Sequence, residues 1–318
     1  MRFSLRLNND ISIDRFVRIA SLAEEMGFDQ LWVSHDLFWR SAPVLVTAAA
    51  NATSRIALGV GVFNPVSMHA AEIAMAAAAL HEVSGGRALL GIGAGADRFL
   101  EWAGIPFETP LRRTRKAILE IRALLAGRVP PGWDEHGYLR VGPAPIPIYV
   151  GAMGPKMLEL AGEVADGALP LLFPPEHYSL AAAQIGDGAR RAGREIDSID
   201  IAACVWCSID SDQRKATRTL AEKIAYFGAS FSPDLLARAS LTPEDFPAGM
   251  DPQQVNARML SLGIAGSADD VAQRCQALVA AGAGHISFGP PLGPDPEQAV
   301  AALGRHVLPK LVGSNDRS

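Results

Sequence analysis

One pattern recurs along the whole chain: a short β-branched or apolar run is followed by a longer segment with helical periodicity. Eight such runs are expected to be strands: Arg2–Leu7, Gln30–Ser34, Ile56–Val62, Ala88–Ile92, Ile146–Val150, Gly167–Leu172, Ile199–Trp206 and His285–Gly289. Alternating strands and helices form right-handed crossovers, which bring the strands into a parallel sheet. Eight units predict an α/β fold that closes into a (β/α)8 TIM barrel. A doubly wound open sheet is the alternative.

The segments between these strands carry helix signals. Ile13–Met26 is amphipathic and ends at Gly27, whereas the alanine-rich segment Met68–Val83 ends at a Ser-Gly-Gly turn. The other expected helices are Pro43–Ala52, Leu111–Leu125, Pro155–Val164, Glu176–Ala192, Ala268–Ala281 and Pro296–Leu311.

Two segments interrupt the alternation. Residues 127–147 are rich in glycine and proline, and a small hairpin is expected around Tyr138–Val141. Residues 211–262 are too long for a simple connection and predict a helical insertion. Because α/β barrels often exceed about 250 residues as one unit, residues 1–318 are expected to form a single barrel domain. Long insertions in such barrels usually shape or cover the active site.

The composition excludes several classes of protein. The net charge is −5 and basic residues do not gather into a footprint for nucleic acid. The longest apolar runs, such as Ile73–Leu80, are far shorter than the roughly 20 residues that span a bilayer. The first residues alternate polar and apolar, unlike a signal peptide, so neither a membrane nor nucleic acid is expected as a partner and the expected location is cytoplasmic.

The three cysteines are too few for a disulfide framework and are interpreted as structural.

In a parallel barrel the active site lies where strands end and βα loops begin. The first expected strand leads to Asn8, and the second to His35 and Asp36. A histidine beside a carboxylate at such a place is a candidate for proton transfer or cofactor contact. A helix cap by Asp36 and a surface His35 are the structural alternative.

The next strand ends are rich in small residues. The third contains Gly59 and Gly61, which suggest a bulge or close approach by a ligand, and Asn64 follows with a donor and an acceptor for a planar heterocycle. The fourth leads into Gly91-Ile92-Gly93-Ala94-Gly95, where backbone N–H groups can approach a phosphate or ring. The fifth leads into Gly151-Ala152-Met153-Gly154-Pro155-Lys156, a helix start that can bind an anion.

Familiar hydrolytic and nucleotide motifs are missing from the sequence. There is no H-E-x-x-H, G-x-S-x-G or Walker pattern, and the glycines after the fourth strand do not follow G-x-G-x-x-G. The sequence therefore nominates no hydrolytic nucleophile and no metal ligands.

Four stretches together resemble the bacterial luciferase-like oxidoreductase superfamily, and within it the reductases of the methylenetetrahydromethanopterin reductase type that use the 5-deazaflavin coenzyme F420. These are 31–40, 59–95 with Glu82-Val83-Ser84-Gly85-Gly86-Arg87 at its centre, 147–167, and 267–311 with Gly289-Pro290-Pro291-Leu292-Gly293-Pro294. The resemblance implies a bulged third strand with a non-prolyl cis peptide at Gly61-Val62, behind the deazaflavin ring. The residues implied to hold the cofactor are Gly61, Val62, Phe63, Asn64, Gly93, Ala94, Gly95, Gly151, Ala152, Met153, Gly154, Pro155 and Lys156.

The chain departs from the family pattern near the expected substrate pocket. The family usually has Asp before His at the second strand end, where this chain has His35 before Asp36. Phe63 stands where Thr is usual, and Met68-His69-Ala70 where Arg-His-Pro is usual. These differences argue against assuming a pterin substrate.

The leading hypothesis is an F420-dependent oxidoreductase, in which hydride moves between the deazaflavin C5 and an electrophilic C=C, C=N or carbonyl carbon. His35, Asp36 or Asn8 would donate the proton or hold a small-molecule or peptide-borne substrate. An FMN-dependent monooxygenase that uses reduced flavin and oxygen is the second hypothesis, and a non-catalytic cofactor-binding barrel is the third. A homodimer is implied by the resemblance.

Overall fold

The computed structural model describes residues 1–95, 97–106, 108–231 and 233–312. Within them, nine parallel strands form one sheet in the order β6-β5-β4-β3-β2-β1-β9-β7-β8, and β6 also pairs with β7. The β6–β7 pairing closes eight of the strands into a barrel, so the open-sheet alternative is wrong. The strands are β1 (Arg2–Leu7), β2 (Gln30–Val33), β3 (Ala57–Phe63), β4 (Ala88–Ile92), β5 (Ile148–Ala152), β6 (Gly167–Pro170), β7 (Asp200–Ile209), β8 (Ile264–Gly266) and β9 (His285–Leu292).

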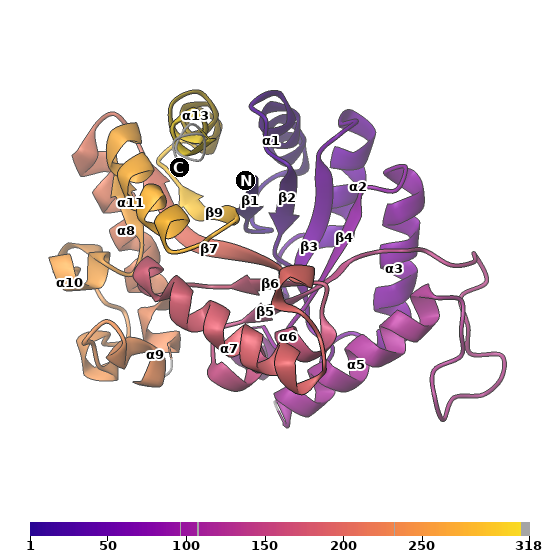
Figure 1. Cartoon of the computed structure of the whole chain (residues 1–318). Coiled ribbons are helices and arrows are strands. Elements are labelled where there is room, and N and C mark those ends of the chain that lie inside the picture. Colours follow the sequence, from indigo (N-terminus) through magenta and orange to yellow (C-terminus); the bar gives the residue numbers. More distant parts are fainter. Residues whose placement is uncertain (96, 107, 232, 313–318) are drawn as a thin grey trace.

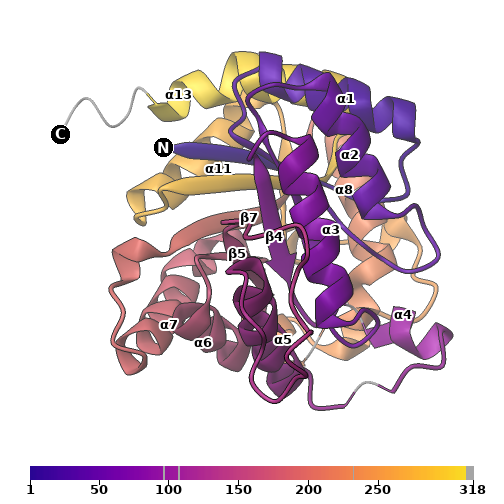
Figure 2. The same cartoon turned by 90° about the vertical axis from the view of Figure 1, so that its right-hand side faces the viewer.

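Helices surround the barrel (Figure 1). They are α1 (Ile13–Glu25), α2 (Ala42–Ala52), α3 (Ala70–Val83), α4 (Asp97–Trp102), α5 (Pro110–Leu125), α6 (Pro155–Val164), α7 (Tyr178–Arg191), α8 (Gln213–Phe227), α9 (Pro233–Ala237), α10 (Ala257–Leu260), α11 (Ala268–Ala280), α12 (Pro296–Ala302) and α13 (Leu308–Val312). A π-helical turn, Leu303–Val307, joins α12 to α13. Figure 2 shows α1, α2 and α3 packed side by side along the strands.

The two irregular segments differ in content. Residues 127–147, all of which are described, hold neither helix nor strand, so the hairpin expected at Tyr138–Val141 is wrong. Trp133 instead ties this loop to the barrel, because its ring stacks on His69 and its indole N–H donates to Glu120 on α5. Residues 211–262, hereafter the long connection, carry α8, α9 and α10 and pack a hydrophobic cluster separate from the main core.

Large side chains fill the inside of the barrel. Trp32 is fully buried there, and its ring meets that of Tyr149 at 5.0 Å between centroids. A side chain on Gly59 would lie 2.4 Å from the Trp32 ring, and one on Gly167 would lie 2.2 Å from Tyr149. The glycine at position 59 therefore makes room for a core side chain rather than for a ligand.

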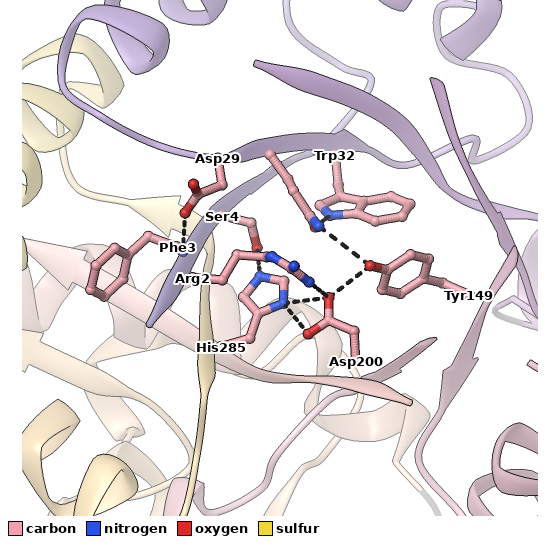
Figure 3. A network of polar contacts seen from close by, with 9 residues as sticks. Arg2, Phe3, Ser4, Asp29, Trp32, Tyr149, Asp200 and His285 are labelled. Atoms are coloured by element: carbon pink, nitrogen blue, oxygen red, sulfur yellow. Dashed lines mark hydrogen bonds and ion pairs between the residues drawn. The ribbon is translucent and has the colours of Figure 1, made fainter. Parts of the chain in front are cut away.

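A polar network closes the amino-terminal end of the barrel (Figure 3). Asp200 on β7 pairs with Arg2 at 2.5 Å, accepts from the Tyr149 hydroxyl at 2.7 Å, and contacts His285 Nδ1 at 3.1 Å. His285 Nε2 in turn meets Ser4 Oγ at 2.8 Å. Although burial alone would raise it, contacts with His285, Tyr149 and Arg2 hold the pKa of Asp200 well below its usual range. This end of a barrel usually serves stability, which these interlocked contacts fit.

Among the described residues, no helix combines the length and the apolar character needed to cross a membrane.

Candidate active site at the carboxyl ends of the strands

A cavity of about 430 Å³ opens at the carboxyl ends of the strands, between the barrel and the long connection. Polar groups line it from the end of β1, from the segment after β2 and from α8, whereas apolar side chains line it from the segment after β6, from β7 and from the long connection. A second cavity of about 390 Å³ shares Asn8, Asp36, Lys223 and Phe227 with it. The residues that line the first cavity are Arg6, Leu7, Asn8, Ser34, Asp36, Gly61, Gly95, Met153, Gly154, Pro155, Leu171, Trp206, Lys223, Phe227, Ser230, Phe231, Asp234, Leu235, Arg238 and Pro290.

The expected site residues divide into two groups. Those that line the cavity are Asn8, Asp36, Gly61, Gly95, Met153, Gly154 and Pro155. Those that lie outside its lining are His35, Val62, Phe63, Asn64, Gly93, Ala94, Gly151, Ala152 and Lys156. The second group mostly shapes or supports the first.

Asp36 and His35 point in different directions, as neighbours at a strand end do. Asp36 faces both cavities and accepts a hydrogen bond from Ser34 Oγ at 3.0 Å. Burial raises the pKa of this carboxyl, against the opposing effects of Ser34 and Lys223. His35 instead accepts from the Ala42 amide at 3.2 Å, at the first turn of α2, and its pKa is lowered by burial. The alternative of a helix cap by Asp36 and a surface His35 is therefore wrong: His35 contacts the helix start, and Asp36 faces the cavity.

Three strands pack around Val62. The Gly61-Val62 peptide is cis and the β3–β4 register shifts between Val60 and Phe63, which confirms the bulge and the cis bond that the resemblance implied. A side chain on Gly151 would lie 2.7 Å from Val62 Cγ1, and one on Gly93 would lie 3.0 Å from Val62 Cγ2. These two glycines therefore accommodate Val62, and through it they fix the floor of the cavity at Gly61.

Asn64 supports the glycine-rich loop after β4 rather than presenting a free amide. Its Nδ2 donates to the Ala94 carbonyl and its Oδ1 accepts from the Val66 amide at 2.9 Å. Gly95, at the end of this loop, has φ +67 and lines the cavity. Lys156 is exposed on the first turn of α6, outside the lining.

Arg6 is a cavity residue that was not expected from the sequence. It lies on β1 opposite Trp32, and its guanidinium donates to the Val205 carbonyl at 3.0 Å. A side chain on Gly289 would lie 2.1 Å from the Arg6 guanidinium, so this glycine gives it space. The signal was present in the sequence: alternate residues of β1, namely Arg2, Ser4 and Arg6, are polar and share the inner face of the barrel.

Lys223 and the aromatic side chains of the long connection also escaped prediction. The Lys223 ammonium lies 4.0 Å from the Phe227 ring centroid and 5.6 Å from that of Trp206. Burial lowers the pKa of Lys223 to about 8, although Asp10 and Asp36 oppose that shift. Phe173, Trp206 and Phe231 pack together beside this lysine, with centroids 4.7–5.6 Å apart. The long connection thus brings a cation, Lys223, and the rings of Phe227 and Phe231 to the cavity, beside Trp206 of β7.

Within the described residues, no group of three or more His, Cys, Asp or Glu side chains could hold a metal ion.

Comparison with known proteins extends these observations. Residues 1–285 match the Luciferase-like monooxygenase family. The 5,10-methylenetetrahydromethanopterin reductases of Methanolobus tindarius and Archaeoglobus fulgidus are 35% and 34% identical to the chain, covering 97% and 98% of it and all of each relative. The structure of coenzyme F420 dependent tetrahydromethanopterin reductase from Methanopyrus kandleri superposes with a TM-score of 0.89 at 30% identity, covering 98% of this chain and 99% of that one. The chain therefore belongs to the luciferase-like monooxygenase family.

Proposed function

We propose that this protein is an F420-dependent oxidoreductase acting on a small molecule. The observation that carries the proposal is a cavity wall without side chains, formed by Gly61, Gly95 and Gly154 from three different strand ends. Similarity along almost the whole chain to a reductase that depends on coenzyme F420 supports the same conclusion.

The residues at the cavity fit a planar deazaflavin. Gly61, Gly95 and Gly154 present no side chain to it, and Leu7 and Leu171 add apolar surface. Helix α6 begins behind Gly154, which caps it without a side chain, so the first turn has space for an anion such as the cofactor phosphate. When bound, the deazaflavin would exchange a hydride with an electrophilic C=C, C=N or carbonyl carbon.

The chain would orient the acceptor, exclude water from the cavity and donate a proton. Trp206, Phe227 and Phe231 line the cavity on the side of the long connection, where their apolar rings would exclude water from a bound cofactor. Asp36 would hold a proton at its carboxyl, because burial favours its neutral form. Asn8, which lines both cavities, would orient the acceptor through its amide.

A titration with oxidised F420 tests the proposal. We expect micromolar binding, and oxidation of the reduced coenzyme once a suitable acceptor is added. Tight binding of FMN without F420 binding, together with oxygen uptake, would establish a flavin monooxygenase instead. Cofactor binding with no acceptor reduced from a broad panel would favour a non-catalytic barrel.

We further propose that the protein acts in the cytoplasm as a homodimer. The absence of long apolar helices among the described residues is compatible with that location. Light scattering of the purified chain measures the oligomeric state, and a mass of one chain would contradict the dimer.

A further inference from the structure

We propose that the acceptor carries an anionic group, a carboxylate or a phosphate, which binds between Arg6 and Lys223. The inference rests on the proposed function, because the acceptor is the molecule that this function reduces or oxidises.

Arg6 holds a positive charge that the protein leaves unneutralised. Among the described residues, its buried Nε has no hydrogen-bond partner, and its guanidinium donates only to the Val205 carbonyl, through Nη2. An arginine stays protonated even when desolvation disfavours its charge. A buried cation without a carboxylate is costly, so a ligand anion that completes it would bind favourably.

Lys223 brings a second cation to the same cavity from α8. Its ammonium packs over the Phe227 and Trp206 rings, which stabilise a cation without cancelling its charge. The charged groups that influence it are Asp10, Asp36, Arg6 and Arg98. Within the part of the chain that is described, neither Lys223 nor Arg6 forms an ion pair with a carboxylate.

The balance of charge in the cavity favours an anion. Arg6, Lys223 and Arg238 line it together with two carboxyl groups, Asp36 and Asp234. Burial favours the neutral form of Asp36, and Asp234 is exposed at the outer edge. The inner part of the cavity therefore carries net positive charge.

The position of these cations indicates the acceptor rather than the cofactor phosphate. Arg6 is on β1, whereas the α6 start that would receive the phosphate follows β5, and these strands lie on opposite sides of the barrel. Lys223 also lines the second cavity, away from Gly154 and Pro155. The anion would lie next to Asp36, the proposed proton donor, since Asp36 and Lys223 interact electrostatically.

The test compares charged acceptors with neutral ones. Reduced F420 is mixed with α,β-unsaturated acids, 2-oxo acids and cyclic imine carboxylic acids, each paired with its primary amide. The variants are Lys223→Met and Arg6→Met, and the matched control is Lys215→Met, an exposed lysine on the same helix. Sulfate binding to each protein is measured by calorimetry, which needs neither cofactor nor turnover.

The wild type is expected to prefer acids over their amides, and Lys223→Met to raise KM for the acids by about 10- to 100-fold, the scale of a charge-assisted hydrogen bond. Sulfate affinity should fall similarly in Lys223→Met and stay unchanged in Lys215→Met. If Arg6→Met does not fold, the KM for the acids and the sulfate affinity of Lys223→Met decide whether the acceptor's anion binds here.

Equal use of acids and amides, or a preference that survives in Lys223→Met, overturns the inference. Unchanged sulfate affinity in that variant overturns it too. Weakened binding of F420 itself, with acid preference intact, would assign the cations to the cofactor. If no F420 binds but sulfate affinity depends on Lys223, the proposed function fails while the anion site stands.

Discussion

Asp36 is the proposed proton donor, because its side chain faces both cavities while His35 contacts the start of α2. Replacing it by asparagine keeps the shape of the side chain and removes the proton. We expect Asp36→Asn to lower kcat by about 100-fold, within the usual range for general acids, and to leave the Kd for F420 unchanged. Stopped-flow oxidation of reduced F420 measures both.

The pH profile separates proton donation from mere positioning. Because burial raises the pKa of Asp36, its acid form persists above the ordinary carboxyl range, and turnover should fall as pH rises through that raised pKa. Asp36→Asn should lose this limb of the profile. His35→Gln should change kcat by less than about tenfold, since its ring lies outside the cavity lining. A larger loss at His35 than at Asp36 would reverse the assignment.

Sequence reasoning predicted some of the side chains that line the cavity and missed others. Asn8, Asp36 and Gly95 were predicted at strand ends and line the cavity, because the barrel gathers its strand ends around one place. Lys223 could not be found, since it lies on a helix whose path over the barrel is not encoded in local periodicity. The opposite directions of His35 and Asp36 likewise depend on the backbone at the end of β2.

At the level of elements, Val62 of β3 packs against Gly93, which follows β4, and against Gly151 of β5. Gly151→Ala would place a methyl 2.7 Å from Val62 Cγ1, and either Val62 or the strand must shift. We expect about 1–3 kcal/mol of destabilisation, the usual range for overpacking, together with weaker F420 binding. Thermal unfolding and cofactor titration measure the two effects.

Gly284→Ala is the matched control. An added methyl there meets no described atom within 4 Å, and its φ lies outside the left-handed region. Its melting temperature and F420 affinity should equal those of the wild type. If Gly151→Ala and Gly284→Ala have the same melting temperature and F420 affinity, Val62 can move aside for the added methyl group, and the proposed tight packing is wrong.

Elements with strong local signals were predicted closely and weak ones were not. The bounds of β1, β4 and α6 agree with the sequence prediction. The sequence did not predict β8, because this strand has only three residues and is defined by its pairing with the end of β7. The cis bond at Gly61-Val62 came from family resemblance, since no local pattern encodes a peptide isomer.

For the whole molecule, the network around Asp200 joins β1, β5, β7 and β9 at the end opposite to the cavity. Asp200→Asn would leave Arg2 and His285 without their carboxylate. We expect the free energy of unfolding to fall by about 2–3 kcal/mol, the scale of a lost hydrogen bond to a charged group. Affinity for F420 should not change, because these residues lie far from the cavity lining.

The same variant has a predictable pH dependence. The folded-state pKa of Asp200 is held below its ordinary value, so its contribution is present above about pH 4 and is lost as pH falls further. Urea unfolding at pH 7 and at pH 3 should show the gap between wild type and variant narrowing at the lower pH. A gap that widens on acidification would contradict the role given to this carboxylate.

The long connection packs Leu220, Ile224 and Phe246 against Phe173 and against Trp206 of β7, in a hydrophobic cluster apart from the main core. Residues that touch the acceptor from this side can therefore change without disturbing the packing that holds the barrel closed. We expect natural variation in substrate choice to accumulate in this segment first, while the strand ends proposed to hold the cofactor stay fixed. Directed evolution for new acceptors should begin by randomising positions in 223–238.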